Sequence, residues 1–140
     1  MKVTTSRKPS PGTRRFAKTL ATFLGLPYVT RGKSNLDPGE VWFVVVERHG
    51  NPSGIEKRAG GAEETLSFTI SAAKRIQKLK TRKPWVVGTF GMSRSVAGFF
   101  SLEWDPEYRA ERTIRVTGEL IEFKDGEDTI LRLKIYEGPC

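Results

Sequence analysis

Lysine and arginine side chains near the start of the chain are the residues whose types and spacing are best suited to chemistry, and that chemistry is anion binding. Residues 1–36 carry eight basic side chains and no acidic one. Residues 37–140 hold the other 16 basic side chains and all 16 acidic ones, so the net charge of +8 lies entirely in the opening segment. Since Arg contacts phosphate through two parallel hydrogen bonds and Lys acts as a point charge, this asymmetry predicts a phosphate-rich partner. The alternative is a solvated N-terminal arm.

Catalytic and metal-binding interpretations have less support. The single histidine, His49, stands at a predicted strand end without an identifiable partner that would orient it for acid–base catalysis. Gly32-Lys33-Ser34 resembles the end of a phosphate-binding loop, but that motif requires glycine where Pro27 stands. One histidine and one cysteine are too few to hold structural zinc, and one cysteine cannot form an intramolecular disulfide. We therefore expect neither a metal nor another cofactor.

The basic segment includes a predicted helix over residues 11–24. Ser10 suits the N-cap, Pro11 the first helical position and Gly25 the C-cap. Its apolar stripe consists of Phe16, Leu20 and Phe23. The opposite face carries Arg14, Arg15 and Lys18. Unpaired N–H groups gather at a helix N-terminus, where an acidic residue is usual. The first turn here has none, so an external anion is expected to compensate.

Loops on either side of this helix are expected to add to the same site. Four basic side chains flank the helix and a short strand that is predicted over residues 27–30: Arg7, Lys8, Arg31 and Lys33. Because loops at the same strand ends gather at one edge of an α/β sheet, these side chains are expected to converge on one ligand. A second basic run, from Lys74 to Lys83, is either a solvated face or a second contact surface.

Strand patterns dominate the rest of the chain. Strands are predicted at residues 3–6, 41–46, 55–58, 66–70, 85–87, 114–123 and 129–136, with turns at 50–54, 60–61 and 125–126. Ser93 is expected to cap a second helix, whose apolar residues are Val96, Phe100 and Trp104. The strand–helix–strand order at the start predicts an α/β fold with a mixed sheet flanked by helices.

The length suits one domain, in which two halves, about 1–80 and 84–137, resemble each other weakly. The apolar series Leu66, Phe68 and Ile70 matches Leu131, Leu133 and Ile135 at an offset of 65. We therefore predict an internal duplication. The longest uncharged stretch is too short to span a bilayer, and no signal-peptide core follows the N-terminus. We expect a cytoplasmic protein without a membrane partner.

The chemistry of the anionic partner favours RNA over duplex DNA. The sequence has no helix-turn-helix, homeodomain or zinc-finger pattern, and it lacks the aromatic motif of RRM domains. Its basic residues lie on loops and one helix face, which suits irregular RNA bound through its backbone.

Four segments resemble the signature of the Brix-domain family, and the similarity is strongest to its short archaeal members. The segments are residues 4–10 (TTSRKPS), Thr13-Arg14 with Phe16, Arg31-Gly32-Lys33, and residues 47–52 (ERHGNP). The match covers residues 2–72. The C-terminal match is looser, since residues 127–130 stand where many Brix proteins carry Gly-Pro-Arg-Phe.

The resemblance implies a non-enzymatic ribosome biogenesis factor that binds ribosomal RNA or its precursor and assists its processing, folding or pairing during subunit assembly. It also implies a fold similar to the anticodon-binding domain of class IIa aminoacyl-tRNA synthetases, in which a mixed sheet lies between helices and has two related halves. The RNA-facing positions that it implies are Arg7, Lys8, Arg14, Arg31, Lys33, Arg48 and His49, to which the helical wheel adds Arg15 and Lys18. The alternatives are an adaptor that binds other ribosome assembly proteins with weak RNA affinity, and an RNA-processing enzyme that depends on His49.

Overall fold

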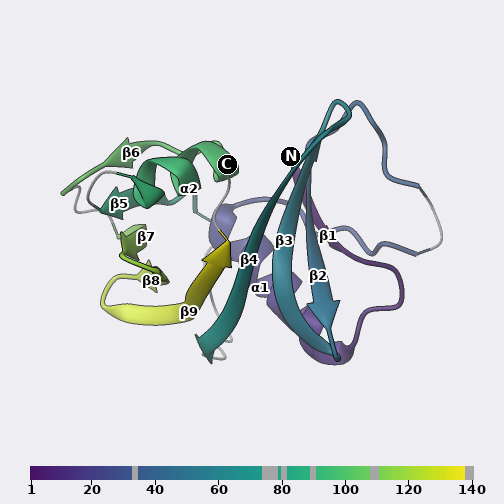
Figure 1. Ribbon diagram of the computed structural model, residues 1–140, viewed down its shortest axis with the longest axis horizontal. Helices are drawn as coiled ribbons and strands as arrows, with labels where there is room; N and C mark the ends of the chain where they lie inside the picture. The colour runs from purple at the N-terminus through teal and green to yellow at the C-terminus, as the bar shows by residue number, and fades with distance from the viewer. Residues whose placement is uncertain (33–34, 74–78, 80–81, 89–90, 108–110, 138–140) are drawn as a thin grey trace.

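A nine-stranded mixed sheet and two helices make up the computed structural model, which describes residues 1–32, 35–73, 79, 82–88, 91–107 and 111–137 (Figure 1). The first half contains β1 (Lys2–Thr5), α1 (Pro11–Leu24), β2 (Trp42–Arg48), β3 (Asn51–Ala59) and β4 (Ala62–Ala73). The second half contains β5 (Trp85–Gly88), α2 (Met92–Phe100), β6 (Trp104–Asp105), β7 (Arg112–Thr117), β8 (Leu120–Asp125) and β9 (Asp128–Glu137). No helix within these residues is long and apolar enough to cross a bilayer.

The two halves share an arrangement of four strands and one helix, to which the second half adds β6 beside β5. In the first half β1 pairs in parallel with β2, and the sheet continues antiparallel through β3 to β4. In the second half β5 pairs in parallel with β7 and continues antiparallel through β8 to β9. The antiparallel pair β4–β9 joins them, so the strand order is β1-β2-β3-β4-β9-β8-β7-β5-β6. The mixed α/β architecture expected from the sequence is confirmed.

The register of the strands shifts the sequence alignment of the two halves by two residues. Leu66 lies opposite Ile55, and Leu133 lies opposite Ile121, so Leu66 is equivalent to Leu133 rather than to Leu131. The turns of the two hairpins correspond at an offset of 66, since Ala59 pairs with Ala62 as Asp125 pairs with Asp128. A register shift of one residue after residue 123 in the β8–β9 pair raises this offset to 67. Because side chains alternate with a period of two, the apolar residues of both alignments face the core.

One hydrophobic cluster lies between the sheet and both helices. The ring of Phe43 in β2 contacts Phe99 and Phe100 of α2, with centroids 5.7 and 5.5 Å apart. The ring of Phe23 in α1 lies 5.3 Å from Phe123 of β8. Each helix therefore packs against a strand of the opposite half, and the two halves share a core.

Helix α1 has the bounds and caps predicted from the sequence. The side chain of Ser10 accepts a hydrogen bond from the Thr13 N–H, Pro11 is the first helical residue, and Gly25 ends the helix at φ +71°. The apolar stripe is buried, and the three basic residues of the opposite face are exposed. Local chemistry alone fixes this helix, because every capping group lies within a few residues of its end.

Two predictions for loops in the first half are wrong. Residues 27–30 do not form a strand, since only Tyr28 pairs with β1, opposite Val3. Pro27 has no N–H to extend the pairing toward Met1, and on the other side the Val29 carbonyl accepts a hydrogen bond from the Thr4 hydroxyl at 2.6 Å. The turn predicted at 50–54 is a two-residue turn at His49 and Gly50, both with positive φ, and β3 begins at residue 51.

Two predictions for the second half are also wrong. The second helix has Gly91 rather than Ser93 at its N-cap, because the Ser93 hydroxyl instead accepts a hydrogen bond from the Trp104 indole at 3.0 Å. That helix ends at Phe100, and Trp104 belongs to β6. The strand predicted over 114–123 is a hairpin, β7 and β8, that turns after residue 117 at Gly118, whose φ is +59°.

Candidate nucleic-acid interface

The loop before α1 and the turn between β2 and β3 meet at one end of the first half. The Ser10 hydroxyl donates to the Gly50 carbonyl at 2.7 Å, and the Ser10 N–H donates to the Glu47 carboxylate at 3.0 Å. These bonds bring two pairs of predicted site residues, separated by some 40 positions in the chain, to the same end of the molecule: Arg7 with Lys8, and Arg48 with His49.

Glu47 supplies the negative charge that the first turn of α1 lacks. Its carboxylate accepts hydrogen bonds from the Ser10 N–H at 3.0 Å and the Thr13 hydroxyl at 2.5 Å. The Thr13 N–H is already bonded to the Ser10 side chain, and Pro11 has no N–H. Glu47 thus provides, from within the fold, part of the negative charge that the argument from the sequence assigned to an external anion. The prediction that the surrounding basic side chains bind phosphate stays a prediction.

Replacing Glu47 by glutamine is expected to lower the free energy of unfolding by about 1 kcal/mol at neutral pH. Hydrogen bonds from Thr13 and Ser10 hold the pKa of the Glu47 carboxyl below its ordinary value of 4.5. Such a carboxyl stabilises the fold above its unfolded pKa and loses that contribution as the pH falls through the folded pKa. In urea unfolding the two proteins should differ at pH 7 and converge as the pH falls below 4.5 and through the lowered pKa of the folded state. Glu64→Gln, at an exposed strand position, is the control, and a gap that persists in acid would contradict the assignment.

Two predicted site residues have a positive φ, a backbone conformation that residues other than glycine rarely adopt. Lys8 has φ +55° and His49 has φ +53°. Such residues cost on the order of 1 kcal/mol each and are found preferentially at functional loops. Both belong to the end of the molecule where the two loops meet, and His49 is exposed there.

Helix α1 presents a basic face next to this end. Arg14, Arg15 and Lys18 are exposed, as the helical wheel predicts. The Lys18 ammonium lies 5.7 Å from the centre of the Tyr28 ring. The cationic surface thus extends from the two loops along the helix.

Arg31 joins Arg7 on the sheet face that α1 does not cover. Arg31 donates to the Thr5 carbonyl at 3.3 Å, and Arg7 donates to the Asn35 side chain at 2.9 Å. Burial, followed by the charges of Arg58 and Arg7, lowers the pKa of the Arg31 guanidinium. Two of the four side chains that were expected to converge, Arg7 and Arg31, thus lie near each other. Lys33 lies outside the described residues, as do the predicted contacts at residues 74–78 and 80–81.

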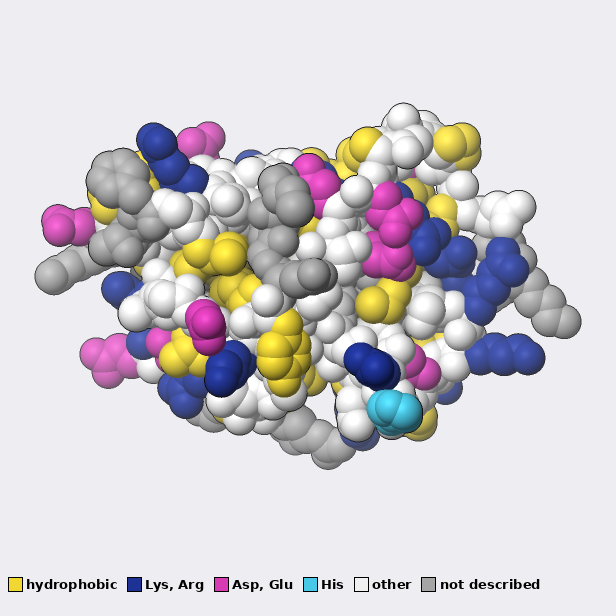
Figure 2. All heavy atoms as spheres, in the orientation of Figure 1, with side chains coloured by type: hydrophobic (Ala, Val, Ile, Leu, Met, Phe, Trp, Pro, Cys, Tyr) yellow, Lys and Arg dark blue, Asp and Glu magenta, His cyan; other side chains and the backbone are white. Residues whose placement is uncertain are grey.

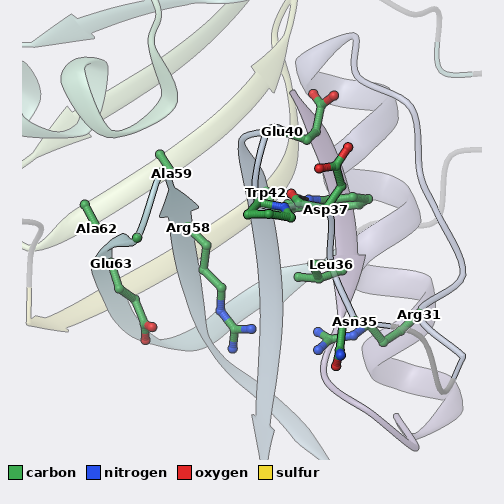
Figure 3. Close-up of a pocket in the computed structure, with 13 residues that line it drawn as sticks. Arg31, Asn35, Leu36, Asp37, Glu40, Trp42, Arg58, Ala59, Ala62 and Glu63 are labelled. Atoms are coloured by element: carbon green, nitrogen blue, oxygen red, sulfur yellow. Dashed lines mark hydrogen bonds between the residues drawn. The ribbon is translucent and has the colours of Figure 1, made fainter.

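Arg58, which the sequence analysis missed, completes this group of arginines. It follows Glu56 by two positions on β3, so both side chains lie on one face of the strand, and they form an ion pair at 3.1 Å. The two arginines, Arg31 and Arg58, line a pocket beside Trp42 (Figure 3). A spacing of two on a predicted strand is the sequence signal that pairs Arg58 with Glu56.

The basic side chains of the interface are not neutralised within the fold. None of the following forms an ion pair with another described residue: Arg7, Lys8, Arg14, Arg15, Lys18, Arg31 and Arg48. Figure 2 shows dark-blue side chains at the right-hand end of one face, over the elements of the first half, and others at the left, over the second half. Within the described ranges, no group of three His, Cys, Asp or Glu side chains is arranged to hold a metal ion.

Comparison with known proteins identifies archaeal relatives that share one description. The chain is 43% identical to the "Probable Brix domain-containing ribosomal biogenesis protein" of Archaeoglobus fulgidus, over 96% of this chain and 94% of the relative. It is 48% identical to the protein of the same description from Methanothermobacter thermautotrophicus, over 75% of this chain and 72% of the relative. No protein-family model matches the chain.

Solved structures share the fold. An archaeal Imp4-like protein superposes with a TM-score of 0.76 at 30% identity, over 98% of this chain and 97% of its own. A probable ribosomal biogenesis protein from Aeropyrum pernix superposes with a TM-score of 0.65 at 22% identity, over 99% of this chain and 98% of its own, which supports the fold alone.

Proposed function

The chain belongs to the family of Brix domain-containing ribosomal biogenesis proteins, and from this premise we propose that it binds ribosomal RNA or its precursor. The protein assists the folding, pairing or processing of that RNA during subunit assembly, without catalysing a reaction. It works in the cytoplasm, and its partners are RNA and other assembly factors. The likeness of the fold to the anticodon-binding domain of class IIa aminoacyl-tRNA synthetases belongs to this proposal as well.

The observation that carries the proposal is a set of exposed cations that form no ion pair with another residue of the described ranges. They occupy the two loops at one end of the first half and the free face of α1. A protein that neutralises phosphates with Lys and Arg releases condensed counterions from the nucleic acid, and this release supplies affinity without a cofactor. Exposed arginines that are not held by carboxylates remain available for such contacts.

The salt dependence of RNA binding tests the proposal. If about five phosphates of single-stranded RNA are contacted, the logarithm of the binding constant should fall with the logarithm of salt concentration at a slope of roughly −3.5. Fluorescence anisotropy of a labelled RNA, between about 50 and 200 mM salt, measures this slope. A slope near zero would contradict an electrostatic clamp. Weak RNA affinity, together with a protein partner that stays bound after nuclease treatment, would favour the adaptor instead.

A further inference from the structure

A pocket of about 320 Å³ lies between residues 35–40 and the β3–β4 hairpin. It opens on the sheet face opposite to Phe43 and the helices, because Trp42, which lines it, precedes Phe43 in β2 and points the other way. Figure 3 shows Arg58 and Glu63 on the hairpin side and Arg31 across from them. Its volume lies at the lower end of the range in which proteins hold small ligands, about 300 to 1,000 Å³.

Hydrogen-bond donors in this pocket lack partners. The Nε groups of Arg31 and Arg58 are buried, and neither has a hydrogen-bond partner within the described part of the chain. Each guanidinium uses another nitrogen for an internal bond, Arg31 to the Thr5 carbonyl and Arg58 to the Glu56 carboxylate. Buried polar groups are normally paired, so these two guanidinium groups have more donors than the fold satisfies. The Arg58 side chain is 39% exposed, so the rest of its guanidinium can donate to an acceptor in the pocket.

The pocket also has more hydrogen-bond acceptors than its internal bonds use. Glu56 lies beside Glu63, and burial followed by this neighbour raises the pKa of the Glu56 carboxyl. Glu63 itself lies opposite Arg58 on the neighbouring strand and lines the pocket. Two adjacent carboxyl groups have more acceptor sites than the single ion pair with Arg58 uses. The pocket therefore suits a ligand that offers donors and acceptors together.

The geometry points to this pocket as the site of one guanine base, unstacked from the single-stranded RNA whose backbone contacts the neighbouring arginines. This inference rests on the proposed function. Guanine carries two adjacent N–H donors, N1 and N2, which match a carboxylate such as Glu63. It also carries the O6 and N7 acceptors, which match a guanidinium such as Arg58. Unstacked bases of RNA loops are recognised in this way, through hydrogen bonds to their edges.

The other bases fit this pair of side chains less well. Adenine presents a donor beside an acceptor, a pattern that the amides of Asn and Gln match and that an arginine and a carboxylate do not. Cytosine offers a carboxylate only one amino group, and uracil has no amino group. The site thus predicts a preference for guanine within RNA that is otherwise held through phosphates.

Short labelled RNAs of about nine nucleotides test this preference by fluorescence anisotropy. One RNA contains only uridine, and three others carry a single central guanosine, adenosine or inosine. The guanosine RNA is expected to bind about tenfold more tightly than the all-uridine RNA. Inosine, which lacks the N2 amino group, should lose most of that gain. Equal binding of the guanosine and uridine RNAs would overturn the pocket assignment and leave the proposed function standing.

Two variants of pocket residues and a matched control test whether the preference for guanosine arises at this pocket. Glu63→Gln and Arg58→Met should each reduce the preference for guanosine to about threefold or less, and all-uridine RNA should still bind. Glu64→Gln removes the same charge from the next residue of β4, which points to the other face, and it should keep the preference. Thermal unfolding of all three variants separates a lost site from a lost fold. A preference that survives in both folded pocket variants would refute the assignment.

A second arm separates this inference from the proposed function. If neither the guanosine RNA nor the all-uridine RNA binds at low salt, the proposed function fails. The pocket is then tested by itself with GMP and UMP. The amide NMR signals of Gly60 and Gly61, which line the pocket, should shift with GMP and not with UMP. The absence of a GMP-specific shift would overturn the pocket as well.

Discussion

Replacing Arg14 and Arg48 together by glutamate is expected to weaken the binding of single-stranded RNA by more than about 100-fold at 0.1 M salt. The free energy of unfolding should stay within about 0.5 kcal/mol of the parent, because both side chains are exposed and neither forms an ion pair with a described residue. Anisotropy with a labelled RNA gives the affinity, and urea unfolding gives the stability.

The size of this effect follows from counterion release. One phosphate contact on a single strand contributes a salt slope of about −0.7, which is roughly fivefold in affinity at 0.1 M salt. Changing arginine to glutamate removes that contact and adds a repulsion of similar size, so each site contributes about 25-fold. Even if the effects at the two sites are partly coupled, the combined loss of affinity stays above about 100-fold.

Arg115→Glu with Lys134→Glu is the matched control. Both residues are exposed on strands of the second half, and the double variant changes the net charge by the same amount. A few-fold loss of affinity is expected from the lower net charge alone. Equal losses in the two double variants would mean that RNA is attracted by overall charge and not by the first-half surface. A loss of stability in the Arg14 and Arg48 variant would favour a structural role for those side chains.

Local signals were sufficient to predict the elements whose ends are set by neighbouring residues. Helix α1 follows from Ser10, Pro11 and Gly25, and β2 follows from a continuous run of β-formers. The hairpin at Gly118 was missed because β-forming residues continue on both sides of the turn. Where two strong strand signals adjoin, a single glycine is the only local sign of a turn.

The candidate site depends on contacts that no local pattern reveals. Glu47 lies 34 positions from Thr13, in the first turn of the helix that it caps. Arg58 reaches the pocket from a strand for which the sequence analysis predicted no site residue. The ERHGNP segment did contain Glu47, but its role follows only from the tertiary contact with Ser10 and Thr13. By contrast, the exposed basic face of α1 follows from helical periodicity alone.

The C-terminal ends of both helices also depend on contacts that no local sequence pattern reveals. Neither helix has a basic residue in its last turn, although cations are favoured there. Lys57 of β3 donates to the Gly98 carbonyl of α2 at 3.1 Å, and Arg112 of β7 donates to the Phe23 carbonyl of α1 at 3.0 Å. Each half thus supplies the cation that completes the helix of the other half. These contacts hold the helix that carries the basic face against the whole sheet.

Arg112→Met is expected to destabilise the protein by about 3–5 kcal/mol in urea unfolding. Arg112 is only 2% exposed, its Nε pairs with Asp125 at 3.4 Å, and its guanidinium lies 4.8 Å from the centre of the Phe23 ring. Its loss leaves the Phe23 carbonyl and the Asp125 carboxylate without that donor. Arg132→Met is the control, since Arg132 forms a similar cross-strand pair with Glu122 but is 41% exposed, and its loss should cost less than about 1 kcal/mol. Similar losses in both variants would show that burial of Arg112 adds nothing, and that the attachment of α1 to the second half depends on apolar packing alone.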